Sequence, residues 1–343
     1  MADAASDSAA DQLDRAIIRG LQLSPRVAFS TLARVLNVSE QTVARRYRRL
    51  RRAGLVRVTA VVSPEALGES NWIVRIDCRP TGATSLAQAL AQREDVGWVS
   101  VSAGGTQVLC TVRSRTAAER EDLLLQRLPR STQVLAMSAA MVLHRFLGGA
   151  ADDWAGIDAA LTAEQEQALR RDADRAPATF ADLGVARLDD VDTRMLTALV
   201  ADGRASLTSL AAAGGISEGR ADRRLASLLG RGIAYLDVDV PIEAFGYRTV
   251  AHLWLSVSPA HLDGAGRELA TCPEVAFVGA ITGTHNLYAA VLCRSTAALY
   301  RFVTERVGAI KGITSLEVAP VIRTVKQADS LLSEGRLAPD PAT

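Results

Sequence analysis

Apolar residues at the start of the chain recur three and four positions apart, which is the spacing of a helix with one buried face. A second short helix, a tight turn at Asn37-Val38-Ser39 and a third helix follow, and the next residues read as β. The pattern predicts three helices and a strand, over residues 14–21, 31–36, 40–53 and 55–62. This order is typical of a helix-turn-helix followed by a wing hairpin.

The pattern then changes to short apolar strands separated by two helical stretches. It predicts strands over 72–78, 96–102, 108–112 and 133–143, with helices over 85–92 and 116–126. This βαββαβ order is that of a ferredoxin-like fold, an antiparallel sheet with helices on one face. The bare face must be buried, and a second copy of the sheet would cover it, so we expect sheet-to-sheet pairing between modules or chains.

The whole pattern occurs twice. Asp14 falls on Asp192, an offset of 192 − 14 = 178 residues, and the same offset carries Ser39 to Ser217 and Gly54 to Gly232. The second helix-turn-helix is expected over residues 192–200, 207–213 and 220–229, and the second βαββαβ run over residues 249–257, 260–270, 275–281, 287–292, 296–307 and 314–322. The fold class is therefore α+β in two repeats, each a winged helix-turn-helix followed by a ferredoxin-like domain.

The expected domains follow from this repeat. They are winged helix-turn-helix 1 (12–62), ferredoxin-like ligand and oligomerisation domain 1 (63–147), a linker with a short helix (148–188), a degenerate winged helix-turn-helix 2 (189–240), ferredoxin-like domain 2 (241–327) and a tail (328–343). In the linker, Thr162 to Gln165 fits a capping box that opens a helix to Arg171. The tail after Gln327 is expected to fray.

Composition narrows the class of protein. The 343 residues, 48% hydrophobic and 22% charged, exceed one ordinary core. No apolar run reaches the roughly 18 residues of a membrane span, and Met1 to Asp14 lacks the pattern of a signal peptide, so the expected compartment is the cytoplasm. The four cysteines form no CxxC pair, which argues against a metal site and favours buried free thiols. No cofactor is expected.

The third helix carries the candidate chemistry. Val43, Tyr47 and Leu50 would pack inward, Ser39 would cap the helix, and most of the remaining surface is arginine. A basic helix behind a capped turn is the unit that enters the DNA major groove, with its first two turns near base edges and its later turns near phosphates. The expected DNA-binding residues of this copy are Ser39, Gln41, Thr42, Arg45, Arg46, Arg49 and Arg52.

The third helix of the second copy, the equivalent of residues 40–53, is less basic. Arg220, Arg223 and Arg224 are its expected contacts, offset by Glu218 and Asp222. Gly219 in its first turn costs roughly 1 kcal/mol relative to alanine. Gly214-Gly215 would loosen the turn before it. This copy either binds DNA less tightly or has become a packing element.

A polar hairpin in the second ferredoxin-like domain is the candidate effector site. Its residues are Thr282, Gly283, Thr284, His285 and Asn286. Hydroxyl, imidazole and amide groups suit the carboxylate and amine of an amino acid, while a polar hairpin without a ligand is the alternative. At the 178-residue offset, copy one has Gln107 in place of the imidazole and Val108 in place of the amide.

These residues resemble the leucine-responsive/asparagine-regulatory (Lrp/AsnC) family of transcription regulators. The match runs through Asp14-x-x-Ile17-Ile18, Leu32-Ala33-x-x-Leu36-x-Val38-Ser39-x-x-Thr42-Val43-x-Arg45-Arg46-x-x-x-Leu50-x-x-x-Gly54-Leu55-Val56, Leu67-Gly68, Gly283-Thr284-His285-Asn286-Leu287-Tyr288 and Gly312-Ile313-Thr314-Ser315. The resemblance implies a non-enzymatic, sequence-specific regulator that binds double-stranded DNA, responds to a small molecule such as an amino acid, and forms homo-oligomers away from membranes. Typical members have one copy and tend to carry an aspartate where Asn286 stands.

Two other functions stay open. Siroheme decarboxylases look like paired members of the same family, and such an enzyme would need a pocket of histidine and arginine side chains. The four histidines here are scattered at residues 144, 252, 261 and 285. Alternatively, the chain senses an effector without binding DNA and co-assembles with single-copy relatives.

Overall fold

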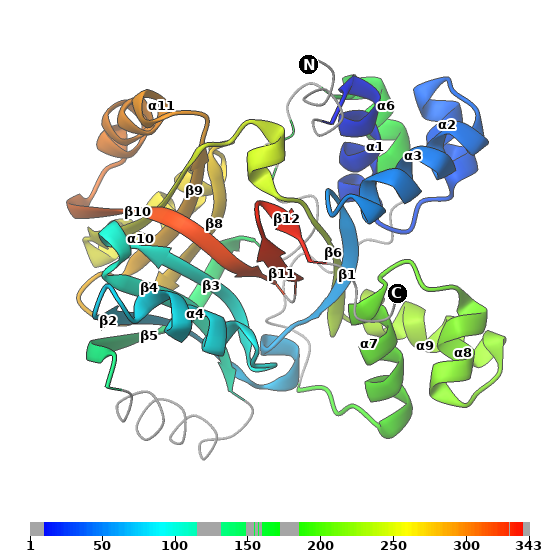
Figure 1. Ribbon diagram of the computed structural model, residues 1–343, viewed down its shortest axis with the longest axis horizontal. Coiled ribbons are helices and arrows are strands. Elements are labelled where there is room, and N and C mark those ends of the chain that lie inside the picture. Colours follow the sequence, from blue (N-terminus) through cyan, green and yellow to red (C-terminus); the bar gives the residue numbers. More distant parts are fainter. Residues whose placement is uncertain are drawn as a thin grey trace. The chain divides into compact units, whose positions relative to one another are not determined.

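The computed structural model describes residues 10–114, 132–148, 154, 157, 160–171, 185–328 and 330–338. The chain forms two compact units, and each unit contains segments of both sequence copies. Unit 1 comprises residues 1–67, 150–245 and 332–343, and unit 2 comprises residues 68–149 and 246–331 (Figure 1). Unit 1 therefore contains both helix-turn-helix segments, and unit 2 contains both ferredoxin-like segments.

In unit 1 the helices of the two copies begin in the same way. Copy one supplies α1 (Gln12–Leu23), α2 (Phe29–Leu36) and α3 (Glu40–Arg52), and copy two supplies α7 (Asp190–Ala201), α8 (Leu207–Gly214) and α9 (Glu218–Gly230). Asp11 caps α1 and Asp189 caps α7, each in a capping box with the aspartate three residues later. The sequence pattern thus predicts these helices to within two residues at each end.

The strand after each reading helix does not form the wing hairpin that the sequence indicated. β1 (Arg57–Val62) pairs antiparallel with β6 (Ala234–Asp239), its counterpart in the other copy. A local return strand is not formed because Ser63-Pro64 leads directly into a 3₁₀ turn, η1 (Glu65–Leu67), and proline offers no N–H to a ladder. Each wing strand is completed by the other copy.

The expectation of a frayed tail is also wrong over residues 330–338. β11 (Ser330–Ser333) and β12 (Arg336–Leu337) form a small hairpin. The Leu337 backbone N–H donates to the Gly54 carbonyl at 3.0 Å, directly after α3. Gly54 has φ +64°, and a Cβ there would lie 2.4 Å from the Leu337 carbonyl oxygen, so only glycine fits.

The linker helix α6 (Ala163–Arg171) covers copy one of the helix-turn-helix. Its expected capping box is present, because Thr162 N–H donates to Gln165 Oε1 at 2.9 Å and Gln165 N–H donates to Thr162 Oγ1 at 3.3 Å. Leu169 of α6 is fully buried beside Gly20 of α1, where a Cβ would meet Leu32 Cδ2 at 2.8 Å. The linker is thus partly a packed element of unit 1.

In unit 2 each copy forms a four-stranded antiparallel sheet, and the described helices pack on one face of each sheet. Copy one contributes β2 (Ser70–Cys78), β3 (Val96–Ser102), β4 (Gln107–Ser114), β5 (Val134–Leu147) and α4 (Ala83–Ala91). Copy two contributes β7 (Thr249–Val257), β8 (Val275–Ile281), β9 (Leu287–Cys293), β10 (Ile313–Gln327), α10 (Leu262–Ala270) and α11 (Thr296–Arg301). The helix expected over residues 116–126 lies outside the described residues.

The predicted pairing between the two sheets is confirmed, and it occurs within one chain. β5 leaves β2 after Met141 and pairs with β8, while β10 leaves β7 after Val321 and pairs with β3. The eight strands therefore close into a ring, β3-β4-β2-β5-β8-β9-β7-β10. Ile73, Leu109 and Trp254 belong to the apolar cluster between the two sheets.

Three of the four cysteines are buried and Cys272 is partly exposed, and all four are free thiols. Burial raises the pKa of the Cys110 thiol to about 12, which makes it unreactive near neutral pH. Among the residues that the structure describes, helices long and apolar enough to cross a membrane are absent.

Candidate nucleic-acid interface and ligand hairpin

The start of α3 is fixed by its cap and by the turn before it. Thr42 N–H donates to Ser39 Oγ at 3.1 Å, as an N-cap serine requires. Asn37 ends α2 in the left-handed region at φ +54°, and Gly215 does the same for α8 at φ +65°. Gly215 therefore supplies the conformation that this turn needs and does not loosen it.

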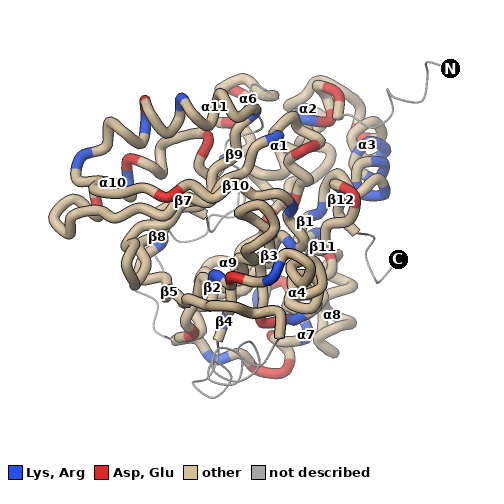
Figure 2. Tube along the Cα trace, turned by 60° about the vertical axis from the view of Figure 1, so that its left-hand side comes forward, with Lys and Arg blue, Asp and Glu red and all other residues tan. Residues whose placement is uncertain are grey.

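One face of α3 is inward and the opposite face is basic. Val43, Tyr47 and Leu50 are buried. The exposed residues of the helix include Gln41, Arg45, Arg48, Arg49 and Arg52, and Figure 2 shows Lys and Arg colouring gathered on it. Thr42 is half-buried, with its hydroxyl 2.8 Å from Ser39 Oγ. The first two turns thus present Gln41 and Arg45, and the last two present Arg48 and Arg52.

Arg46 and Arg49 form ion pairs with aspartates at the start of the chain, although Arg46 is half-buried and Arg49 is exposed. Arg46 forms ion pairs with Asp11 and with the fully buried Asp14, the latter at 3.0 Å, and Arg49 also pairs with Asp14. Sequence reasoning assigned Arg46 to bases and Arg49 to phosphates, and it missed the aspartates that bind both guanidinium groups. These pairs orient α3 against α1.

The same arrangement recurs in copy two and confirms that it belongs to the module. Arg224 pairs with Asp189 at 2.8 Å and with Asp192 at 2.6 Å. The Asp192 backbone N–H and the Arg224 guanidinium hold the pKa of the Asp189 carboxyl below its usual range. The repetition of an Asp-x-x-Asp at residues 11–14 and 189–192 was the sequence signal for these pairs.

The exposed face of α9 differs from that of α3. Arg220 and Arg223 are exposed in its first turns. Its later exposed positions are Ala226, Ser227 and Gly230, which stand where α3 has Arg48, Arg49 and Arg52 at the 178-residue offset. α9 therefore offers fewer cationic side chains to a phosphate backbone.

Unit 1 joins its two helix-turn-helix segments by reciprocal contacts. Arg26 donates to the Gly203 and Ala205 carbonyls at 2.7 and 2.8 Å. Arg204, its counterpart at 26 + 178, donates in return to the Pro25 and Val27 carbonyls. Arg204 also stacks on the Phe29 ring, with its Cζ atom 4.6 Å from the ring centroid. The two segments are thus joined by equivalent hydrogen bonds, which are related by an approximate two-fold axis.

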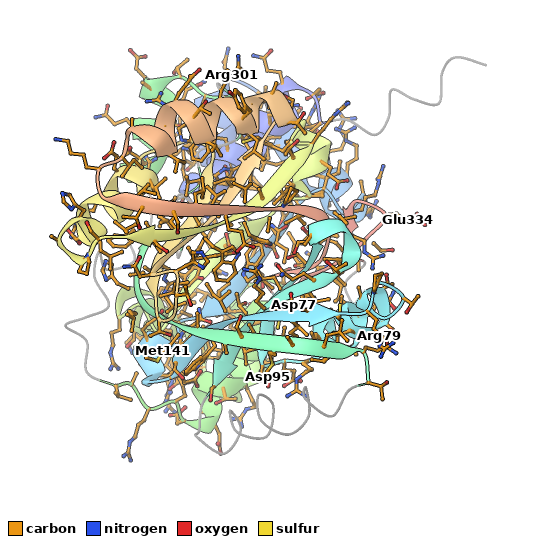
Figure 3. The ribbon with its side chains drawn as sticks, turned by 90° about the vertical axis from the view of Figure 1, so that its left-hand side faces the viewer. Asp77, Arg79, Asp95, Met141, Arg301 and Glu334 are labelled. Atoms are coloured by element: carbon orange, nitrogen blue, oxygen red, sulfur yellow. The ribbon has the colours of Figure 1, made fainter. Side chains whose placement is uncertain are left out.

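Two residues of the hairpin that is expected to bind an effector form hydrogen bonds with the backbone of the protein itself. Thr282 Oγ1 accepts from the Met141 N–H at 2.9 Å, and Thr282 N–H donates to the Met141 carbonyl, so this residue joins β8 to β5; Met141 is labelled in Figure 3. Asn286 binds the backbone of Val257 with both amide atoms, at 2.7 and 2.8 Å. Gly283 has φ +112°, and it and Thr284 are exposed.

The comparison of this hairpin with copy one needs a correction of register. Gln107 pairs with Ser102 as Asn286 pairs with Ile281, so the local offset is 286 − 107 = 179. An amide therefore stands at this position in both copies, and Val108 is not the counterpart of Asn286. Gln107 donates to the Asp77 carboxylate at 2.9 Å, whereas Asn286 binds backbone.

Beside this hairpin lies a polar cluster built from both copies. Arg75 forms a two-point ion pair with Glu317, and its guanidinium carbon lies 5.4 Å from the centroid of the Trp254 ring. The His285 ring centroid is 6.3 Å from that of Trp254. The buried Trp254 Nε1–H has no hydrogen-bond partner among the described residues. The unpaired buried N–H of Trp254 suits an acceptor atom of a ligand, such as a carboxylate oxygen.

A second polar group lies deeper between the sheets. His252 is buried, with Nε2 2.9 Å from Ser100 Oγ and Nδ1 2.7 Å from the Tyr288 hydroxyl. Burial lowers the pKa of His252 to about 4, so its imidazole is neutral at physiological pH. Since both ring nitrogens are engaged, we assign His252 to joining the two copies.

Sequence comparison matches three segments to known families. The AsnC-type helix-turn-helix domain matches residues 11–51 and 188–229, which cover α1–α3 and α7–α9 except for the last residue of α3 and of α9. The Lrp/AsnC ligand binding domain matches residues 250–331, which contain the second ferredoxin-like segment.

Two curated relatives match about two-fifths of the chain. An uncharacterized HTH-type transcriptional regulator of Pyrococcus abyssi is 31% identical over 143 residues, which is 41% of this chain and 89% of the relative. The HTH-type transcriptional regulator LrpA of the same organism is 25% identical over 137 residues, which is 39% of this chain and 97% of the relative. Each relative thus corresponds to a single copy.

A solved structure matches the whole chain in fold. The siroheme decarboxylase NirDL aligns with a TM-score of 0.60 at 15% identity, covering 95% of this chain and 96% of the other. At that identity the likeness is one of fold, a duplicated helix-turn-helix and ferredoxin-like arrangement.

Proposed function

Because this chain belongs to the Lrp/AsnC family of transcription regulators, we propose that it acts by binding double-stranded DNA with α3 and α9 in a sequence-specific way. The observation that carries the proposal is the exposed row Gln41, Arg45, Arg48 and Arg52 behind the capped turn of α3. We assign Gln41 and Arg45 to base edges, and Arg48 and Arg52 to phosphates. Arg220 and Arg223 are the corresponding contacts of α9, and the Ser39 cap positions α3.

The test measures binding of the full chain to its own promoter region by fluorescence anisotropy as salt is raised. Tight binding should weaken steeply, with a slope of log affinity against log salt of roughly 0.9 per phosphate contact. Arg48→Ala plus Arg52→Ala should reduce the slope by about two. Arg45→Ala should cost about 1–3 kcal/mol on the native site and less on unrelated DNA.

Arg301→Ala is the matched control, since Arg301 is an exposed arginine on α11 in unit 2 (Figure 3). It should bind as the wild type does. If Arg45→Ala and the double variant Arg48→Ala plus Arg52→Ala bound DNA as Arg301→Ala does, α3 would not be the DNA-reading surface.

We further propose that unit 2 binds a small-molecule effector, with an amino acid as the first candidate class. The support is the unpaired Trp254 Nε1–H beside His285 and Arg75, together with the exposed turn at Gly283-Thr284. The thermal midpoint of unfolding is measured with each of the common amino acids. Trp254→Phe keeps an aromatic ring and removes the N–H donor, so it should weaken binding about fivefold, which corresponds to roughly 1 kcal/mol for one hydrogen bond.

Trp98→Phe is the control for this test, because Trp98 is 45% exposed on β3. It should leave the ligand-induced shift of the thermal midpoint unchanged. A ligand that shifts the midpoint equally in the wild type and in Trp254→Phe would bind elsewhere.

Assembly of chains into homo-oligomers is a separate proposal. Light scattering with and without ligand tests it.

An enzymatic function is the second candidate, and the whole-chain fold likeness to a siroheme decarboxylase is the observation that favours it. Against it, His252 is the buried histidine of unit 2 and its ring nitrogens are engaged by Ser100 and Tyr288. We therefore propose that the chain is not an enzyme. An absorbance titration with siroheme decides: a bound-tetrapyrrole spectrum with decarboxylated product would replace our proposal.

A further inference from the structure

We propose that a single chain reads an asymmetric DNA site made of two unlike half-sites, a strong one bound by α3 and a weaker one bound by α9. The inference rests on the proposed function, since it requires both helices to bind DNA. It follows from two observations on unit 1. The backbones of the two helix-turn-helix segments are related by a nearly two-fold axis, whereas the exposed side chains of α3 and α9 differ.

The symmetry of the backbone is visible in the strand ribbon of unit 1. In the β1–β6 register Thr59 lies opposite Asp237, and 59 + 178 = 237, so these two equivalent residues mark the axis. Arg57 opposite Asp239 is matched by Val61 opposite Tyr235 on the other side of the axis. The Arg26 and Arg204 clasps obey the same axis. Paired DNA-reading helices related in this way face two half-sites in inverted orientation.

Both helices are held in one unit of one chain, so α3 is always paired with α9. Arg51 of α3 adds an ion pair at 2.9 Å to Asp202, which follows α7 in copy two. A homodimer of single-copy chains would pair two identical helices and would favour a symmetric site. This pairing instead fixes two different helices to one DNA duplex.

The side chains that face outward differ at most equivalent positions. Arg45 and Arg223 are both exposed at one shared position, which predicts one base step in common. The first turn differs, with Gln41 and Thr42 in α3 and Gly219 and Arg220 in α9. Because glutamine and arginine prefer adenine and guanine edges respectively, the neighbouring bases of the two half-sites should differ.

The helices also differ in the charge of their last turns. Arg48 and Arg52 of α3 are replaced by Ala226 and Gly230 in α9. The α9 half-site should therefore contribute fewer released counterions and a smaller salt dependence. Within one bound site, the α3 half should be protected more strongly than the α9 half.

The experiment first locates the protected site in the promoter by footprinting and divides it at its centre into halves L and R. Three duplexes are then compared: L–R as found, and the inverted repeats L–L and R–R. The full chain should bind L–R best, as one chain per duplex by native mass spectrometry. L is the more strongly protected half, which we assign to α3. R–R should bind at least tenfold more weakly than L–R, because α3 then faces bases that it does not prefer while its phosphate contacts are unchanged.

A graft in α9 tests the assignment of residues. The variant Gly219→Gln, Arg220→Thr, Ala226→Arg, Gly230→Arg gives α9 the outward residues of α3. At both glycines an added Cβ has no atom within 4 Å, so a side chain can leave the backbone there without a clash at its first carbon. The variant should bind L–L at least tenfold more tightly than the wild type does and should no longer prefer L–R.

The outcomes separate the two proposals. Equal binding of L–R, L–L and R–R by the wild type, or two chains on each duplex, overturns the asymmetric site while leaving DNA binding intact. The absence of a protected site or of binding to any promoter fragment overturns the proposed function itself. The wild-type comparison of three duplexes decides without the variant, should the graft fail to fold.

Discussion

The buried imidazole of His252 makes the stability of unit 2 depend on pH. Its pKa is lowered from 6.5 to about 4 by burial, and its ring nitrogens contact Ser100 and Tyr288. Between these two pKa values the unfolded chain binds a proton that the folded chain does not bind. The free energy of unfolding therefore falls as the pH is lowered through this window.

The size of the effect follows from the two pKa values. Above pH 6.5 the imidazole is neutral in both states, so its contribution to stability is fully present. Each pH unit below 6.5 removes about 1.4 kcal/mol, because one proton is taken up on unfolding. Lowering the pH from 6.5 to 5.0 should thus cost about 2 kcal/mol through His252 alone.

Urea unfolding followed by tryptophan fluorescence at pH 7.5 and pH 5.0 measures this difference. His252→Gln should be less stable at pH 7.5, because it disturbs two hydrogen bonds, but it should lose about 2 kcal/mol of the pH dependence. His144→Gln, a change at an exposed histidine on β5, is the control and should keep the full dependence. Equal pH dependence in His252→Gln and the wild type would refute the reasoning.

Three further predictions concern contacts of unit 1, and each is tested by thermal unfolding of a variant and its control. Asp14→Asn weakens the ion pairs of Arg46 and Arg49 and should lower the free energy of unfolding by about 1–3 kcal/mol. Asp192→Asn should lower it by less, because Asp192 pairs with Arg224 alone. The reverse order would contradict the ion-pair assignment. Gly54→Ala should lower the free energy of unfolding by about 2 kcal/mol, because alanine is strained in the left-handed region and its Cβ meets the Leu337 carbonyl. In a chain that ends at residue 329 the contact with Leu337 is absent, so only the backbone strain should remain. Arg204→Ala should cost about 1 kcal/mol more than Arg26→Ala, because it also loses an aromatic stack; equal costs would exclude that stack as a stabilising contact.

The local elements of the fold were predictable because their causes lie close together in the sequence. The cap at Ser39 and the apolar spacing of Val43, Tyr47 and Leu50 locate α3 to within one residue. The partner of β1 was not predictable in this way. A wing strand looks the same whether its partner is the next segment or a strand 178 residues away, and only the repeat hints at the second.

The candidate site was predictable in outline and not in its details. Helical spacing places Arg45, Arg46 and Arg49 on the outer side of α3, yet only the tertiary position of Asp14 decides that two of them turn back toward α1. Similarly, the 178-residue offset holds through the helices and becomes 179 in the sheet, where hydrogen-bond register rather than sequence counting determines which residues correspond. Neither fact leaves a trace in hydrophobic periodicity.

The ring of strands in unit 2 has a consequence for behaviour on dilution. β5 and β10 each finish in the sheet of the other copy, so the two ferredoxin-like segments close within one polypeptide. Two separate chains joined by the same strands would dissociate as their concentration fell, because their pairing would obey mass action. Here the pairing is intramolecular, and its equilibrium contains no concentration term. The paired state of this regulator should consequently be as complete in a nanomolar solution as in a millimolar one.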